Sequence, residues 1–190
     1  MILAPIGAVA ALAYAFILSR RVMAQSEGTD LMKKIAASIR SGANAYLKRQ
    51  YKGVSVFFVI MGVVLFALVF AGLVNVFVPV AFVVGGFFSG LSGFLGMKTA
   101  TYASARTANA ARNSLNSGLR IAFRSGAVMG LVVVGLGLLD ISFWYLLLNA
   151  VIPADALTPT HKLCVITTTM LTFGMGASTQ ALFARVGGGI

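Results

Sequence analysis

The sequence is short of acidic residues. Only four of its 190 residues are Asp or Glu, against fifteen Lys or Arg, and it has one His and one Cys. The lone cysteine, Cys164, excludes an intrachain disulfide. No phosphate-binding loop, zinc-ligand spacing or nucleophile triad occurs in the chain, so the common enzyme classes that such motifs mark have little support.

Apolar residues are abundant instead. They make up 59% of the chain, charged residues make up 10%, and the mean hydropathy is +0.94. A soluble domain of this size cannot bury so much apolar surface, so we predict an all-α, polytopic transmembrane helix bundle. Five runs approach the ~20 residues that a bilayer crossing needs. We interpret the chain, 1–190, as one membrane domain with spans at residues 2–19, 54–76, 79–97, 126–152 and 163–190.

The first apolar run differs from a cleaved signal peptide. No basic residue precedes it, Arg20 and Arg21 follow it, and no convincing small-residue cleavage site ends it. We therefore expect a retained helix whose N-terminus lies outside.

Basic residues are distributed unequally between the connections. Eight lie between Arg20 and Lys52, five between Lys98 and Arg124, and only Lys162 lies on the opposite side. By the positive-inside rule, residues 20–53 and 98–125 and the C-terminus are cytoplasmic. The net charge of +11 is then a result of topology, and we expect no nucleic-acid partner because no soluble basic module is present.

The first cytoplasmic connection has a helical pattern. Its apolar residues recur at near-helical spacing, which predicts an amphipathic helix that joins the second span. Two interpretations stay open: a surface helix that touches lipid headgroups, or a helix with a dedicated role beneath a catalytic domain. The residues of the pattern are Leu31, Ile35, Ile39, Ala43 and Leu47.

Small residues crowd the third span. In a bilayer such faces let helices approach closely, so we favour helix packing over a substrate path. The alanine-rich residues 99–116 are expected to prolong this helix into the cytoplasm. The small residues are Gly86, Ser89, Gly90, Ser92, Gly93 and Gly96.

The fifth span carries the main candidate for a functional residue. Gly174, Ser178, Ala181 and Arg185 share one helical stripe, so small side chains lead to a guanidinium. An arginine in an apolar helix usually faces a protein interior or a polar pathway, and if buried it requires a carboxylate partner. No such partner is obvious in the sequence, and the alternative is an arginine that snorkels to the headgroups.

Asp140 lies in the fourth span, too far toward the outside to meet Arg185. An acid in this position is either a proton-relay group or a residue exposed toward the outer headgroups. Trp144 and Tyr145 follow it as an interfacial belt would, which favours the exposed position.

Four ordered segments resemble the membrane-bound, ion-translocating pyrophosphatases. Together they are far more specific than any one alone, and they extend over most of the chain. They are EGTD at 27–30 with IRSGANAYL at 39–47, GMKTATYA at 96–103, FRSGAVMG at 123–130 and FARVGGGI at 183–190.

The resemblance implies a homodimeric pump of about sixteen helices per subunit in a bacterial inner membrane. It would hydrolyse pyrophosphate with Mg²⁺ on the cytoplasmic side, with K⁺ as a possible activator, and move H⁺ or Na⁺ outward. By the same resemblance, Arg185 belongs to the ion gate and pairs with residues of later helices.

The sequence departs from the family in lacking its acidic motifs. Hydrolysis of a phosphoanhydride needs metal ions and a base, and four scattered acids cannot assemble that site. We therefore expect a fragment, the N-terminal five helices, that is inactive alone. The alternative is a non-enzymatic five-helix membrane scaffold or anchor.

Overall fold

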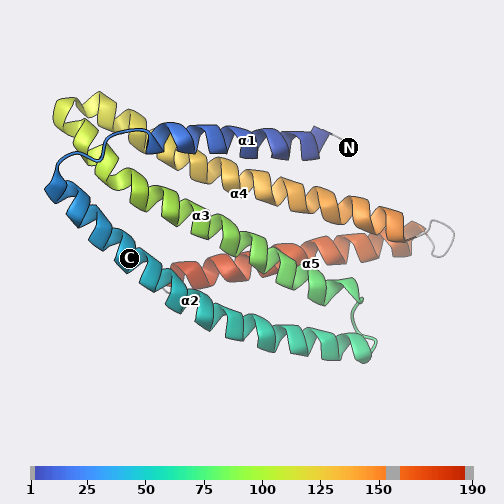
Figure 1. The fold of residues 1–190 in the computed structure, drawn as a ribbon. Helices are drawn as coiled ribbons and strands as arrows, with labels where there is room; N and C mark the ends of the chain where they lie inside the picture. The colour runs from blue at the N-terminus through green and yellow to red at the C-terminus, as the bar shows by residue number, and fades with distance from the viewer. Residues whose placement is uncertain (1–2, 153–158, 187–190) are drawn as a thin grey trace. The chain divides into compact units, whose positions relative to one another are not determined.

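The computed structural model describes residues 3–152 and 159–186, which form five α-helices and no strand (Figure 1). The prediction of an all-α fold is confirmed. The helices are α1 (Leu3–Met23), α2 (Asp30–Phe70), α3 (Phe77–Asn113), α4 (Leu115–Val151) and α5 (Pro159–Val186).

Four of these helices, α1 to α4, are long and apolar enough to cross a bilayer. The chain is therefore a multi-pass membrane protein. The fifth predicted span does form a helix, α5, but α5 is not among the four. Polar side chains dilute its apolar residues, and its crossing of the membrane stays a prediction. The polar residues within it include Thr167, Thr168, Thr169, Thr172, Ser178, Thr179 and Gln180.

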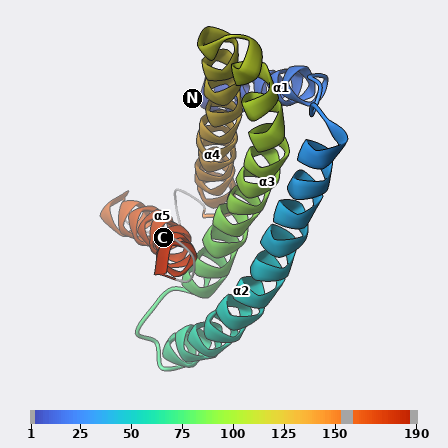
Figure 2. The same ribbon diagram turned by 90° about the vertical axis from the view of Figure 1, so that its left-hand side faces the viewer.

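The helices extend well beyond the predicted spans. At about 1.5 Å per residue, the 41 residues of α2 measure roughly 60 Å, twice the ~30 Å thickness of a hydrocarbon core. Figure 2 shows α2 as one uninterrupted helix, so the predicted continuity between the amphipathic segment and the second span is confirmed. The predicted extension of the third helix is confirmed as far as Asn113, and a break at Ser114 separates it from α4.

The second span was predicted to reach about residue 76, and α2 ends six residues earlier, at Phe70. The helix stops at Phe70 because Gly72 takes a positive φ of 72°. Its N–H donates to the Val69 carbonyl (2.9 Å), and the N–H of Leu73 donates to the Leu68 carbonyl (3.1 Å). This is a Schellman cap, which favours glycine at the left-handed position.

Contacts divide the chain into two compact units. Unit 1 comprises Met1–Pro5, Gln50–Leu91 and Gly137–Ile190, and unit 2 comprises Ile6–Arg49 and Ser92–Leu136. The core of unit 1 joins α3, α4 and α5 through Ala81, Trp144, Leu148, Ile152, Val165, Ile166 and Phe173. Unit 2 has two smaller clusters, one formed by Ala15, Leu18, Val128 and Val132 and the other by Val22, Ala103 and Ile121.

Within unit 1, α3 and α5 cross in near contact of their backbones. A Cβ atom added to Gly85 would collide with the carbonyl oxygen of Phe173, and one added to Gly176 would collide with the carbonyl oxygen of Phe82. We call these four residues the glycine crossing. This close approach agrees with the prediction that small residues of the third span serve helix packing. The predicted pattern, however, named Gly86 and did not include Gly85 or Gly176.

Candidate functional site

Arg185 lies in the last turn of α5, and its side chain is exposed within this chain. Two contacts in unit 1 hold that end of α5 against α2. The Gln50 amide donates to the Phe183 carbonyl (3.3 Å), and the ring centroids of Phe57 and Phe183 lie 4.8 Å apart. These contacts position the last turn of α5, which carries Arg185.

The stripe of small residues that leads to Arg185 is not the face that packs. Ser178, Ala181 and Arg185 are exposed, and Gly174 is only partly covered. The buried face of α5 lies elsewhere, and the predicted closure of helices around Arg185 does not occur within the described chain. The residues of the buried face are Val165, Ile166, Thr169, Thr172, Phe173, Gly176 and Gln180.

No ion pair of the described residues includes Arg185. Lys162 at the other end of α5 donates to the Ile152 carbonyl (2.8 Å), and two further contacts in unit 1 use neutral groups. Ser89 donates to the Ala177 carbonyl (3.0 Å), and the Tyr51 hydroxyl donates to the Gly90 carbonyl (2.7 Å). Among the described residues, Arg185 is thus an exposed guanidinium without an ion pair.

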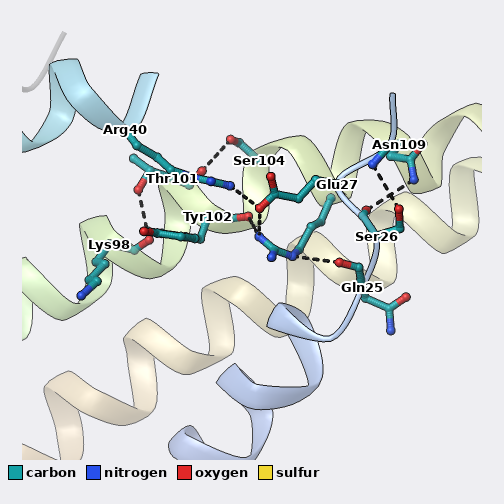
Figure 3. A network of polar contacts seen from close by, with 11 residues as sticks. Gln25, Ser26, Glu27, Arg40, Lys98, Thr101, Tyr102, Ser104 and Asn109 are labelled. Atoms are coloured by element: carbon teal, nitrogen blue, oxygen red, sulfur yellow. Dashed lines mark hydrogen bonds and ion pairs between the residues drawn. The ribbon is translucent and has the colours of Figure 1, made fainter. Parts of the chain in front are cut away.

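A second polar site lies in unit 2, where the Glu27 carboxylate forms ion pairs with two arginines (Figure 3). Arg40 Nη2 lies 2.5 Å and Arg106 Nη1 lies 3.0 Å from the same carboxylate oxygen, Oε1. The Arg40 guanidinium also lies over the Tyr102 ring, 4.1 Å from its centroid. We call Glu27, Arg40, Tyr102 and Arg106 the Glu27 cluster. It ties α2 and α3 to the linker between α1 and α2.

The linker itself is bound to α3 through its backbone. Arg106 Nε donates to the Gln25 carbonyl (3.0 Å), and Asn109 donates to the Ser26 carbonyl (3.4 Å). Gly28 has a φ of 90°, and a Cβ atom there would come within 2.7 Å of the Asn109 side-chain oxygen. The backbone conformation therefore favours glycine here, and a larger residue would also displace the Asn109 side chain.

The hydrogen bond from Arg40 lowers the pKa of Glu27, with the charges of both arginines acting in the same direction against the opposing effect of burial. The Glu27 side chain is only 18% exposed, so its carboxylate is largely shielded from water. Because its pKa is lowered, the carboxylate is ionised at neutral pH. Sequence reasoning did not find this cluster. The sequence did offer one signal: Glu27 is one of only four acids and lies in a connection with eight basic residues, so an ion pair there could have been predicted.

Asp140 is buried, with an exposure of 1%, and Trp144 one turn later is 3% exposed. The interpretation of Asp140 as exposed toward the headgroups, beside an interfacial tryptophan, is therefore wrong for this chain. The sequence could not reveal that α4 turns this face toward its neighbours. Neither Asp140 Oδ2 nor Trp144 Nε1 has a hydrogen-bond partner among the described residues.

The acids do not gather into a metal site within the described residues. No group of three potential metal ligands occurs there. Glu27 is paired with arginines, and Asp30 lies in solvent with a side chain that is 98% exposed beside Lys33 (3.0 Å). Asp140 is enclosed on a different unit, and Asp155 lies outside the described residues. The donor set that Mg²⁺ prefers is not assembled in this part of the chain.

The chain is similar to known ion pumps over nearly its whole length. The family described as inorganic H⁺ pyrophosphatase matches residues 9–190. A protein of Bacteroides thetaiotaomicron, named as a putative K⁺-stimulated pyrophosphate-energized sodium pump, is 75% identical over 190 residues, which cover 99% of this chain and 26% of that protein. A K⁺-insensitive pyrophosphate-energized proton pump of Moorella thermoacetica is 41% identical over 187 residues, 98% of this chain and 25% of that protein. The chain thus spans about a quarter of the length of these relatives.

Proposed function

Because the chain belongs to the inorganic H⁺ pyrophosphatase family, we propose that it is the N-terminal part of a membrane pump that couples pyrophosphate hydrolysis to outward movement of H⁺ or Na⁺. The family match over residues 9–190 carries this proposal, and the relatives are named for both ions. The family match also argues against the alternative of an unrelated five-helix scaffold. The proposal includes a homodimer in a bacterial inner membrane, and the names of the relatives make K⁺ a candidate activator.

The proposed topology places residues 20–53 and 98–125 in the cytoplasm. A single cysteine introduced at Ser38, which is exposed on the first half of α2, provides the test in intact cells. The exposed Cys164 must first be replaced so that it does not react. We expect no labelling at position 38 by an impermeant reagent added from outside. Labelling there without permeabilisation would reverse the topology.

We propose that the hydrolytic site, with its Mg²⁺, lies in the part of the pump beyond this chain. The dispersed acids of the described residues support this assignment. The 190-residue chain, purified alone, should release no phosphate from pyrophosphate in a Mg²⁺-dependent assay. Activity that copurifies with this chain, and not with a soluble host pyrophosphatase, would place the site here.

Arg185 is the residue of this chain that we assign to the ion gate. Three observations support the assignment: the contacts of Gln50 and Phe57 that position the end of α5, the exposure of the stripe below Arg185, and the lack of a carboxylate partner among the described residues. In the complete pump, a helix from the remaining sequence would cover the stripe and supply the acid.

The test measures hydrolysis and ion transport together, in vesicles that contain the complete pump. Arg185→Ala should strongly reduce transport because it leaves the partner acid unpaired. Arg185→Lys keeps the charge but not the planar fork, so it should be only partly tolerated. Near-normal hydrolysis and transport in Arg185→Ala would instead indicate an arginine that contacts headgroups.

A further inference from the structure

Asp140 on α4 is enclosed by this chain itself. Its residue exposure is 1%, so no helix from outside the chain can reach its carboxyl group without displacing what already covers it. This separates Asp140 from Arg185, whose exposed position leaves room for a later partner. A helix from outside the chain is therefore not the expected partner of the Asp140 carboxyl, and the candidates among the described residues are those of the surrounding helices.

The helices of unit 1 offer no cation in their apolar stretches. Residues 53–70 of α2, 77–91 of α3 and 163–184 of α5 contain no charged side chain, and Cys164 is their only titratable group. On α4, Tyr145 is the other titratable group between residues 137 and 151, and α1 adds only the exposed Tyr14 between residues 3 and 19. An ionised carboxylate would thus be buried without a compensating charge, which is strongly unfavourable.

The second observation is the indole of Trp144. It lies one helical turn after Asp140, on the same face of α4, and is 3% exposed. Its Nε1–H, like Asp140 Oδ2, is buried and has no hydrogen-bond partner among the described residues. A buried donor and a buried acceptor thus lie on adjacent turns of α4, and Trp144 belongs to the apolar core that includes Leu148 and Phe173.

We propose that Asp140 is a proton-binding site within the membrane domain, with Trp144 as its neighbouring donor. The bound proton removes the carboxyl charge and turns one oxygen into an O–H donor, so the group can remain inside the apolar core. A metal cation fits less well because it requires several oxygen ligands, whereas the indole presents an N–H group. This site is separate from the proposed gate at Arg185, and its test does not depend on pump activity.

Infrared difference spectroscopy of the full-length protein in lipid tests the proposal at neutral pH. The wild-type minus Asp140→Asn spectrum should contain the carbonyl stretch of a protonated carboxyl group. Trp144→Phe should keep this band and shift it, because the nearby N–H donor is lost. The matched control is Asp30→Asn, which removes an exposed acid and should remove only carboxylate bands.

A spectrum in which Asp140 contributes only carboxylate bands would overturn the proposal. If those bands require Na⁺, the site binds a cation instead.

Discussion

The glycine crossing and the Glu27 cluster hold helices together by opposite means. At the crossing of α3 and α5, the absence of side chains lets the backbone at Gly85 and Gly176 approach the carbonyl groups of the facing helix. In the Glu27 cluster, long charged side chains reach across wider spaces, and both arginines converge on one carboxylate oxygen.

The difference follows from the solvent that surrounds each site. Lipid provides no hydrophobic drive between helices, so close van der Waals contact is the main source of attraction within the predicted spans. In the predicted cytoplasmic part, partly shielded ion pairs can form where water still solvates the remaining charge. The crossing should therefore be sensitive to volume, and the cluster to charge and pH.

The largest effect is expected at the crossing. Gly176→Ala places a methyl group against the backbone carbonyl of Phe82, which cannot rotate away, and should destabilise the full-length protein by about 3 kcal/mol. Gly137→Ala is the matched control in unit 1, because its added Cβ meets nothing within 4 Å. Thermal unfolding in detergent measures both. Equal losses in the two variants would show that the close approach is unimportant.

Removal of the central charge of the Glu27 cluster should have the next largest effect. Glu27→Gln keeps the shape but leaves two arginines without their carboxylate, so we expect a loss of about 2 kcal/mol. Asp30→Asn removes an acid three residues away whose ion pair is solvent-exposed, and it should change stability by only ~0.3 kcal/mol. A comparable loss in Asp30→Asn would point to net charge rather than to the cluster.

The same carboxylate predicts a pH dependence. The folded-state pKa of Glu27 is lowered from 4.5, so its stabilisation is fully present above that value and is lost as the pH falls through the folded pKa. The stability difference between wild type and Glu27→Gln should stay constant around neutral pH and shrink in acid. A difference that instead grows in acid would show that the folded pKa is raised.

The smallest effect concerns the ring beneath Arg40. Tyr102→Leu removes the aromatic face that the guanidinium covers and should cost ~1 kcal/mol. Tyr102→Phe keeps that face and should stay close to wild type in the same unfolding measurement. If both variants lose stability equally, the hydroxyl group and not the ring is the important part.

Local patterns were sufficient for the helices themselves. Apolar runs indicated where each helix crosses or approaches the bilayer, and periodicity indicated that α2 and α3 continue past their spans. The end of α2 was misplaced because the Schellman cap at Gly72 depends on one backbone conformation within an otherwise apolar run.

Long-range contacts were beyond the same reasoning. Arg106 binds a carbonyl group 81 residues away, at Gln25, and no local periodicity identifies such a pair. Asp140 was assigned to the surface from its aromatic neighbours, yet it is buried in the folded chain. On α5, the small stripe that leads to Arg185 was expected to pack, but the opposite face does so.

Hydropathy and charge are enough to make this protein a bundle of membrane helices with basic connections, because both act residue by residue on partition between lipid and water. Which faces of those helices are covered is settled by packing. That choice depends on the fit of surfaces distant in the chain, which is why Asp140 is enclosed and Arg185 is left open.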